Sequence, residues 1–277
     1  MFSIKKEARG ELSILFSNIF FALTAIFVKI IPDTFSGVYI SFFRFASGII
    51  FVVFSILITK SGFRITDKKT FILRGATGAF AMTLYFFAIK YTSSGRATLL
   101  TNTFPVFVAL FGVLFFKEKI YLRNILSIII CVAGVFFVFY DGSHYPFIGD
   151  LLGIISAVFA GMALHFLKKM RNDNSSLIAY FSVCIFGLLF TFFSTGESVN
   201  INLTTLILLL GVSVAAFFAQ FFMGYGFKYV ASIKGSIITF SKIPLTIFFS
   251  FFIGEEITFR FIIGAIFIII GLIVNRE

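Results

Sequence analysis

Long apolar runs separated by short polar breaks divide the whole chain. The runs predict ten segments, near residues 12–31, 36–59, 71–90, 95–116, 122–140, 149–168, 176–193, 204–227, 234–253 and 259–274. A hydrocarbon layer about 30 Å thick is crossed by a helix of about 20 apolar residues, and several runs reach that length. Because a bilayer offers backbone polar groups no other partner, the runs are expected to be helices. The pattern predicts an all-α integral membrane protein with ten transmembrane helices.

The chain also contains an internal repeat. Laid on itself, it aligns Glu11, Ser17, Phe20 and Lys29 with Asp150, Ser156, Phe159 and Lys168, and Lys90, Arg96 and Pro105 with Lys228, Lys234 and Pro244. The two copies are predicted at residues 1–142 and 149–277, with five spans each. Because five is odd, they are expected to insert in opposite orientations as inverted repeats. Inverted repeats suit a transporter, since a central site can then open to each face in turn.

Composition and charge agree with a membrane location. Hydrophobic residues make up 59% of the chain and charged residues 13%, whereas a soluble domain carries about a quarter charged residues. The net charge of +11 would suggest nucleic acid in a soluble protein, but here basic residues lie in short breaks between apolar runs, so no nucleic-acid partner is expected. Most Lys and Arg residues, Arg74 included, fall on the cytoplasmic side if the N-terminus is cytoplasmic. This bias predicts a multi-pass protein of the bacterial inner membrane with both termini inside.

Two similar stretches carry a family resemblance. The first runs from Ala88 to Ala97, through Pro105, to Lys117-Glu118-Lys119-Ile120, and the second from Gly226 to Gly235, through Pro244, to Gly254-Glu255-Glu256-Ile257. With Phe43-Arg44-Phe45 in the second span, they resemble the EamA-type repeat of the drug/metabolite transporter superfamily over essentially the whole chain. The resemblance implies secondary transport, frequently efflux, through a central cavity lined mainly by spans 1, 3, 4, 6, 8 and 9. The resemblance leaves the substrate open. At the starts of the fourth and ninth spans, where small residues are commoner in the family, this chain has Arg96 and Lys234.

Two cations lie within predicted spans, Arg44 and Lys242. Either would be costly against lipid, so each is expected to face the cavity or a protein partner. A substrate contact and a structural contact are equally open for Lys242, and an architectural role is the better reading for Arg44. The acidic residues all fall in loops or at span ends, which argues against carboxylate-based ion coupling. If both cations face the cavity, an anionic or zwitterionic, amino-acid-like substrate with a carboxylate or phosphate is favoured.

Uncharged polar residues near mid-span complete the predicted substrate site: Asn18, Tyr85, Thr101, Asn102, Gln220, Tyr225, Thr239 and Ser241. The alternative for each is an ordinary hydrogen bond between helices. Pro105 and Pro244 are expected to break their helices, because proline lacks an N–H and frees a carbonyl one turn earlier. Broken helices of transporters commonly bind ligands at such places.

The sequence lacks the patterns of an enzyme. It has no Gly-rich phosphate loop, no His or Cys cluster with metal spacing and no recognisable pair of nucleophile and base. No cofactor or metal is therefore expected. The prediction is a secondary-active carrier of a small metabolite in the lipid bilayer, with an exporter and a homodimer both compatible with the sequence. The alternatives are a multidrug efflux carrier for cationic compounds and a lipid-handling membrane protein without transport activity.

Overall fold

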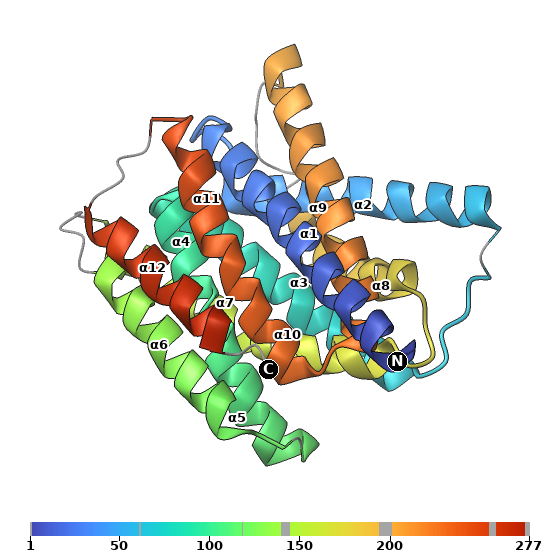
Figure 1. Ribbon diagram of the computed structural model, residues 1–277. Coiled ribbons are helices and arrows are strands. Elements are labelled where there is room, and N and C mark those ends of the chain that lie inside the picture. The colour runs from blue at the N-terminus through green and yellow to red at the C-terminus, as the bar shows by residue number, and fades with distance from the viewer. Residues whose placement is uncertain are drawn as a thin grey trace.

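A computed structural model describes residues 2–60, 62–117, 119–139, 145–193, 201–254 and 259–274 (Figure 1). The secondary structure of these residues is entirely helical. Eight of the predicted spans correspond to single helices: α1 (Phe2–Ile30), α2 (Gly37–Thr59), α3 (Lys68–Tyr91), α6 (Leu122–Phe139), α7 (Phe147–Met170), α8 (Ser176–Thr191), α9 (Leu203–Tyr229) and α12 (Phe259–Val274). The motif residues Glu118, Glu255, Glu256 and Ile257 lie outside the described ranges.

The fourth and ninth spans are each broken. The fourth consists of α4 (Ser94–Thr101) and α5 (Phe104–Phe116). The ninth consists of α10 (Ser232–Ile238), a 3₁₀ turn η2 (Thr239–Ser241) and α11 (Lys242–Phe251). Within the described residues, six helical segments are long and apolar enough to cross a membrane: Lys6–Ile30, Gly37–Thr59, Lys68–Tyr91, Ser94–Phe116, Phe147–Met170 and Leu203–Tyr229.

Side-chain caps fix where several helices begin. Ser36 accepts a hydrogen bond from the Tyr39 N–H at the start of α2, and Asp67 accepts one from the Thr70 N–H at the start of α3. Hydrogen bonds from the hydroxyl and the N–H of Thr70 lower the pKa of Asp67 from 3.8 to about 2. The stability that this cap contributes is therefore fully present above pH 3.8, and it is lost as the pH falls toward the lowered pKa of Asp67, about 2.

Contacts between the helices pair the two halves reciprocally. α1 packs along α9 and α3 packs along α7, while α2 packs on α8 and α6 lies beside α12 (Figure 1). Lys29 at the end of α1 donates to the Thr92 carbonyl at the end of α3 (2.8 Å), and Lys168 at the end of α7 donates to the Val230 carbonyl at the end of α9 (2.7 Å). Each lysine satisfies a carbonyl that the helix end leaves open. The sequence repeat is thus also a repeat of contacts.

Close backbone approach joins α1 to α9. A Cβ atom at Gly226 would stand 2.5 Å from Ile14 Cγ1 and 2.7 Å from the Gly10 carbonyl oxygen. Changing Gly226 to Val is therefore expected to cost about 1–3 kcal/mol through overpacking. The melting temperature in detergent measures this loss and can be followed with a thiol-reactive dye, because the thiols of Cys131 and Cys184 are buried in the folded protein.

The same substitution at Gly62 provides a matched control, because a Cβ atom there meets nothing within 4 Å. An equal loss of melting temperature in both variants would contradict the proposed close packing.

Candidate functional site

A buried cavity lies where helices of both halves meet. It is lined by Asn18, Phe21, Arg74, Gly78, Ala81, Met82, Tyr85, Thr101, Asn102, Phe104, Ser156, Ala160, Ala163, Leu164, Leu167, Met223, Thr239 and Lys242. These residues belong to the first, third, fourth, sixth, eighth and ninth spans, the set that the family resemblance implies. The volume open to the centres of water molecules is about 70 Å³, which is room for several waters in this conformation.

Both helix breaks open onto this cavity. Asn102 follows the last residue of α4, and Pro105 is the second residue of α5. On the other side, Thr239 lies in the 3₁₀ turn and Pro244 is the third residue of α11. Proline is well tolerated in the first turn of a helix, where an N–H has no partner to lose. The two prolines therefore begin new helices, and the residues just before those helices border the cavity.

Lys242 is the first residue of α11, and its side chain is 7% exposed. Its Nζ lies 4.9 Å from the centre of the Tyr85 ring and 5.5 Å from that of Phe21. Aromatic faces attract a cation, but they carry no full negative charge. No carboxylate among the described residues forms an ion pair with Lys242, so these residues offer its ammonium group no countercharge.

Arg74 supplies a second basic side chain to the cavity wall. Arg74 was counted only among the basic residues of the cytoplasmic side and was not predicted at the site, but it lies nearly two turns inside α3, is 3% exposed and lines the cavity. Its Nη2 donates to Gln220 Oε1 over 3.0 Å. The available signal was Asp67 followed three residues later by Thr70, an N-cap that starts the helix before the apolar run begins.

Two amide oxygens in the cavity wall have no hydrogen-bond donor among the described residues, Asn18 Oδ1 and Asn102 Oδ1. Asn18 Nδ2 donates to the Ile238 carbonyl (3.2 Å) and to Ser241 Oγ (2.8 Å), and Asn102 Nδ2 donates to the Thr98 carbonyl (2.6 Å). Since carbonyl oxygens only accept, each amide must point its nitrogen toward them. The freed oxygens are buried acceptors, which are costly without a donor.

The remaining predicted residues divide into three groups. Tyr85, Thr101 and Thr239 line the cavity but already hydrogen-bond within the protein, to Thr98 (2.6 Å), Gly153 (3.5 Å) and Ser236 (2.5 Å) respectively. Ser241 and Gln220 contact the lining residues Asn18 and Arg74. Arg44 and Tyr225 lie outside the cavity: Arg44 is buried against Phe45 and Phe86, and Tyr225 is 38% exposed beside Tyr229.

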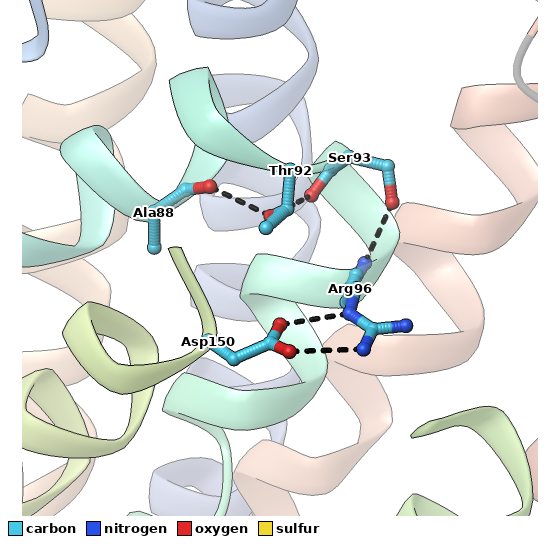
Figure 2. Close-up of polar contacts among 5 residues, drawn as sticks. All are labelled: Ala88, Thr92, Ser93, Arg96 and Asp150. Carbon is cyan, nitrogen blue, oxygen red and sulfur yellow. Dashed lines mark hydrogen bonds and ion pairs between the residues drawn. The ribbon is translucent and has the colours of Figure 1, made fainter. Parts of the chain in front are cut away.

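Two ion pairs join helices at equivalent positions of the repeat. Arg96 at the start of α4 binds both carboxylate oxygens of Asp150 in the first turn of α7, over 2.8 and 2.9 Å (Figure 2). Both side chains are 7% exposed, so Arg96 is buried in a contact between helices. The equivalent Lys234 on α10 contacts Glu11 (2.8 Å) and Glu7 (3.0 Å) of α1, and its side chain is 22% exposed.

Long apolar helices, duplicated halves and a central cavity at two helix breaks define the class of a multi-pass membrane transporter. The chain belongs to the EamA-like transporter family, which matches residues 8–140 and again residues 147–276. The family is one of transporters and not of enzymes. The matches agree with the family resemblance found in the sequence and with two copies of one unit.

Similar proteins include characterised and uncharacterised transporters. Solute carrier family 35 member G1 of Homo sapiens is 30% identical over 189 residues, which are 63% of this chain and 52% of that protein, so the match spans about half its length. The pseudopaline exporter CntI of Pseudomonas aeruginosa is 26% identical over 62% of both chains. An uncharacterized transporter of Helicobacter pylori is 26% identical over 89% of this chain and 87% of its own length.

A crystal structure with 16% sequence identity has the same fold. It superimposes with a TM-score of 0.78 and covers 96% of both chains.

Proposed function

We propose that this chain is a secondary-active carrier that moves a small anionic or zwitterionic, amino-acid-like metabolite across the bacterial inner membrane. The observation that carries the proposal is Lys242, a buried cation at a helix break that faces the cavity without a described carboxylate partner. Arg74 adds a second positive charge to the same wall. A buried charge is costly unless it is paired, and a substrate carboxylate or phosphate would supply that pairing.

The free amide oxygens of Asn18 and Asn102 favour a zwitterion over a simple anion. An ammonium or another N–H group of the substrate would donate to these oxygens while its carboxylate approaches Lys242. A site that offers both a cation and free acceptors discriminates by charge and by the position of the donor. A cationic drug, the alternative substrate class, would meet Lys242 and Arg74 and is disfavoured by charge repulsion.

Alternating access is the proposed mechanism, and the two ion pairs are its proposed gates. With two inverted repeats of five spans and both termini in the cytoplasm, the Arg96–Asp150 pair lies on the outer side and the Lys234–Glu11 pair on the inner side. The outer pair is buried and bidentate, which is the geometry of a closed gate, while the inner pair is partly exposed. Substrate entry requires the helices to separate, because the cavity holds only several waters in this conformation.

Export is the proposed direction, and the pseudopaline exporter among the similar proteins supports it. The substrate of that protein is not assigned to this chain. The direction can be measured with purified protein reconstituted into vesicles in each orientation separately. Substrate is supplied on one side at a time, and its rate of appearance on the other side is compared.

A thermal-shift screen of the detergent-purified protein tests the substrate class. Amino acids, other small carboxylates and phosphorylated metabolites are compared with cationic drugs. A ligand that binds only the folded protein stabilises it by mass action. At 100 times its Kd it adds about 2.7 kcal/mol to the free energy of unfolding and so raises the melting temperature. Zwitterions or anions are expected to stabilise the protein. Stabilisation by cationic drugs alone would contradict the proposal and favour the multidrug alternative.

A further inference from the structure

A second polar cluster lies between α2, α3, α8 and α9, behind the cavity wall. Its members are Arg44, Arg74, Tyr180 and Gln220, and each is at most 3% exposed. Their atoms without a described hydrogen-bond partner are all able to donate: the three guanidinium nitrogens of Arg44, Arg74 Nε, Gln220 Nε2 and the Tyr180 hydroxyl. The Tyr180 hydroxyl lies near Arg44 and Cys184, but one hydroxyl cannot serve the five guanidinium and amide nitrogens, which indicates that a further acceptor belongs among them.

Close contacts place these donors together. A Cβ atom at Gly48, one turn after Arg44 on α2, would stand 2.7 Å from the Tyr180 hydroxyl and 2.6 Å from Cys184 Sγ. A Cβ atom at Gly78, one turn after Arg74 on α3, would stand 2.5 Å from Arg74 Nη1 and 3.0 Å from Val183 of α8. Glycine on α2 and on α3 therefore makes room for the polar groups that meet at α8.

The cluster also carries two positive charges. The guanidinium groups of Arg44 and Arg74 are close enough to repel each other, and in the described part of the chain neither forms an ion pair with a carboxylate. The rings of Phe45 and Phe86, 5.0 and 5.5 Å from the Arg44 guanidinium carbon, compensate only part of one charge. Water could satisfy the donors, but it would leave both charges unbalanced.

We infer that this cluster binds a small monovalent inorganic anion, with chloride as the representative ion. One anion would accept hydrogen bonds from Arg44, Tyr180 and Gln220 and would offset the repulsion between the two guanidinium groups. A monovalent ion fits better than sulfate or phosphate, because the desolvation penalty rises steeply with charge and the surrounding wall is apolar.

The anion would also act on the transport site through one shared hydrogen bond. Gln220 Oε1 accepts from Arg74 Nη2 (3.0 Å), and Arg74 lines the cavity. An anion held by Gln220 Nε2 and Arg74 Nε would fix the orientation of both side chains. The anion site itself stands whether or not the carried substrate is a zwitterion.

Chloride titration of the purified full-length protein tests the inference. Chloride replaces methanesulfonate at constant ionic strength, and the melting temperature is followed. The melting temperature is expected to rise with chloride concentration, and also with bromide. Changing Tyr180 to Phe is expected to raise the half-saturating chloride concentration roughly tenfold, because it removes one hydrogen bond to a charged group and leaves the packing intact. Arg44→Gln is expected to abolish the chloride dependence.

Lys242→Met is the control for the transport cavity, and it is expected to retain the chloride response of the native protein. The inference is overturned if chloride and methanesulfonate give the same melting temperature, or if the Tyr180→Phe variant keeps the native half-saturating concentration. Loss of the chloride response in the Lys242→Met variant would also overturn it, because the ion would then occupy the transport cavity. Should Arg44→Gln fail to fold, Tyr180→Phe still decides the question.

Discussion

Transport by the Lys242→Met variant is expected to fall at least about 30-fold, because removing one partner of a buried charged pair costs roughly 2–5 kcal/mol. Methionine is one atom shorter than lysine, keeps an unbranched apolar side chain and removes the charge. The measurement is uptake into proteoliposomes of the ligand that gives the largest thermal shift. Lys242→Arg keeps the positive charge and is expected to retain more transport than the methionine variant.

The stability of this variant is expected to change in the opposite direction. Lys242 is buried without a described carboxylate partner, so replacing it by methionine removes a desolvation penalty and raises the melting temperature of the ligand-free protein. The ligand-induced shift should vanish at the same time. A variant that transports as well as the native protein would contradict the assignment of Lys242 to the substrate, whatever its stability.

The second large effect is expected at the ion pair between α4 and α7. Asp150→Asn leaves the Arg96 guanidinium buried without its carboxylate, which costs about 3–5 kcal/mol in buried pairs. Glu11→Gln, at the equivalent position of the other half, breaks a pair that is partly exposed and should cost about 1 kcal/mol or less. Melting temperatures of the two variants measure this asymmetry, and the exchanged pair Arg96→Asp with Asp150→Arg should recover part of the loss.

Gating predicts more than a loss of stability. In a background with both native cysteines replaced, Thr101→Cys places a thiol in the cavity wall. A membrane-impermeant maleimide added outside should label this thiol faster in the Asp150→Asn variant than with Asp150 intact. Equal labelling rates would show that the Arg96–Asp150 pair is structural and does not gate the cavity.

The sequence predicts the larger features because they repeat over many residues. Apolar runs and the alignment of Pro105 with Pro244 depend on composition and spacing, and both helix breaks occur just before these prolines. Single side chains are harder to predict. Gln220 and Tyr225 lie on one helix five residues apart, about 140° around its axis, so only one of them can face the cavity region.

The two arginines show the same limit. For Arg44, the sequence predicts that the side chain avoids lipid. Where it is buried depends on Tyr180 and Phe86, which are distant in sequence. Arg74 was missed because the apolar run begins after the helix does. The free oxygens of Asn18 and Asn102 depend on carbonyl groups exposed by the helix breaks, which no spacing of residues reveals.

The lysine contacts at the ends of α1 and α7 have a mechanical consequence. Lys29 in the last turn of α1 and Lys168 in the last turn of α7 each donate to a carbonyl at the end of a neighbouring helix. Glu11 and Asp150, nearer the opposite ends of α1 and α7, form the ion pairs. Each helix is thus held at one end by a lysine–carbonyl hydrogen bond and at the other by an ion pair. A lever with one fixed pivot moves most at its free end, so the greatest displacement of α1 and of α7 is expected at their acidic residues.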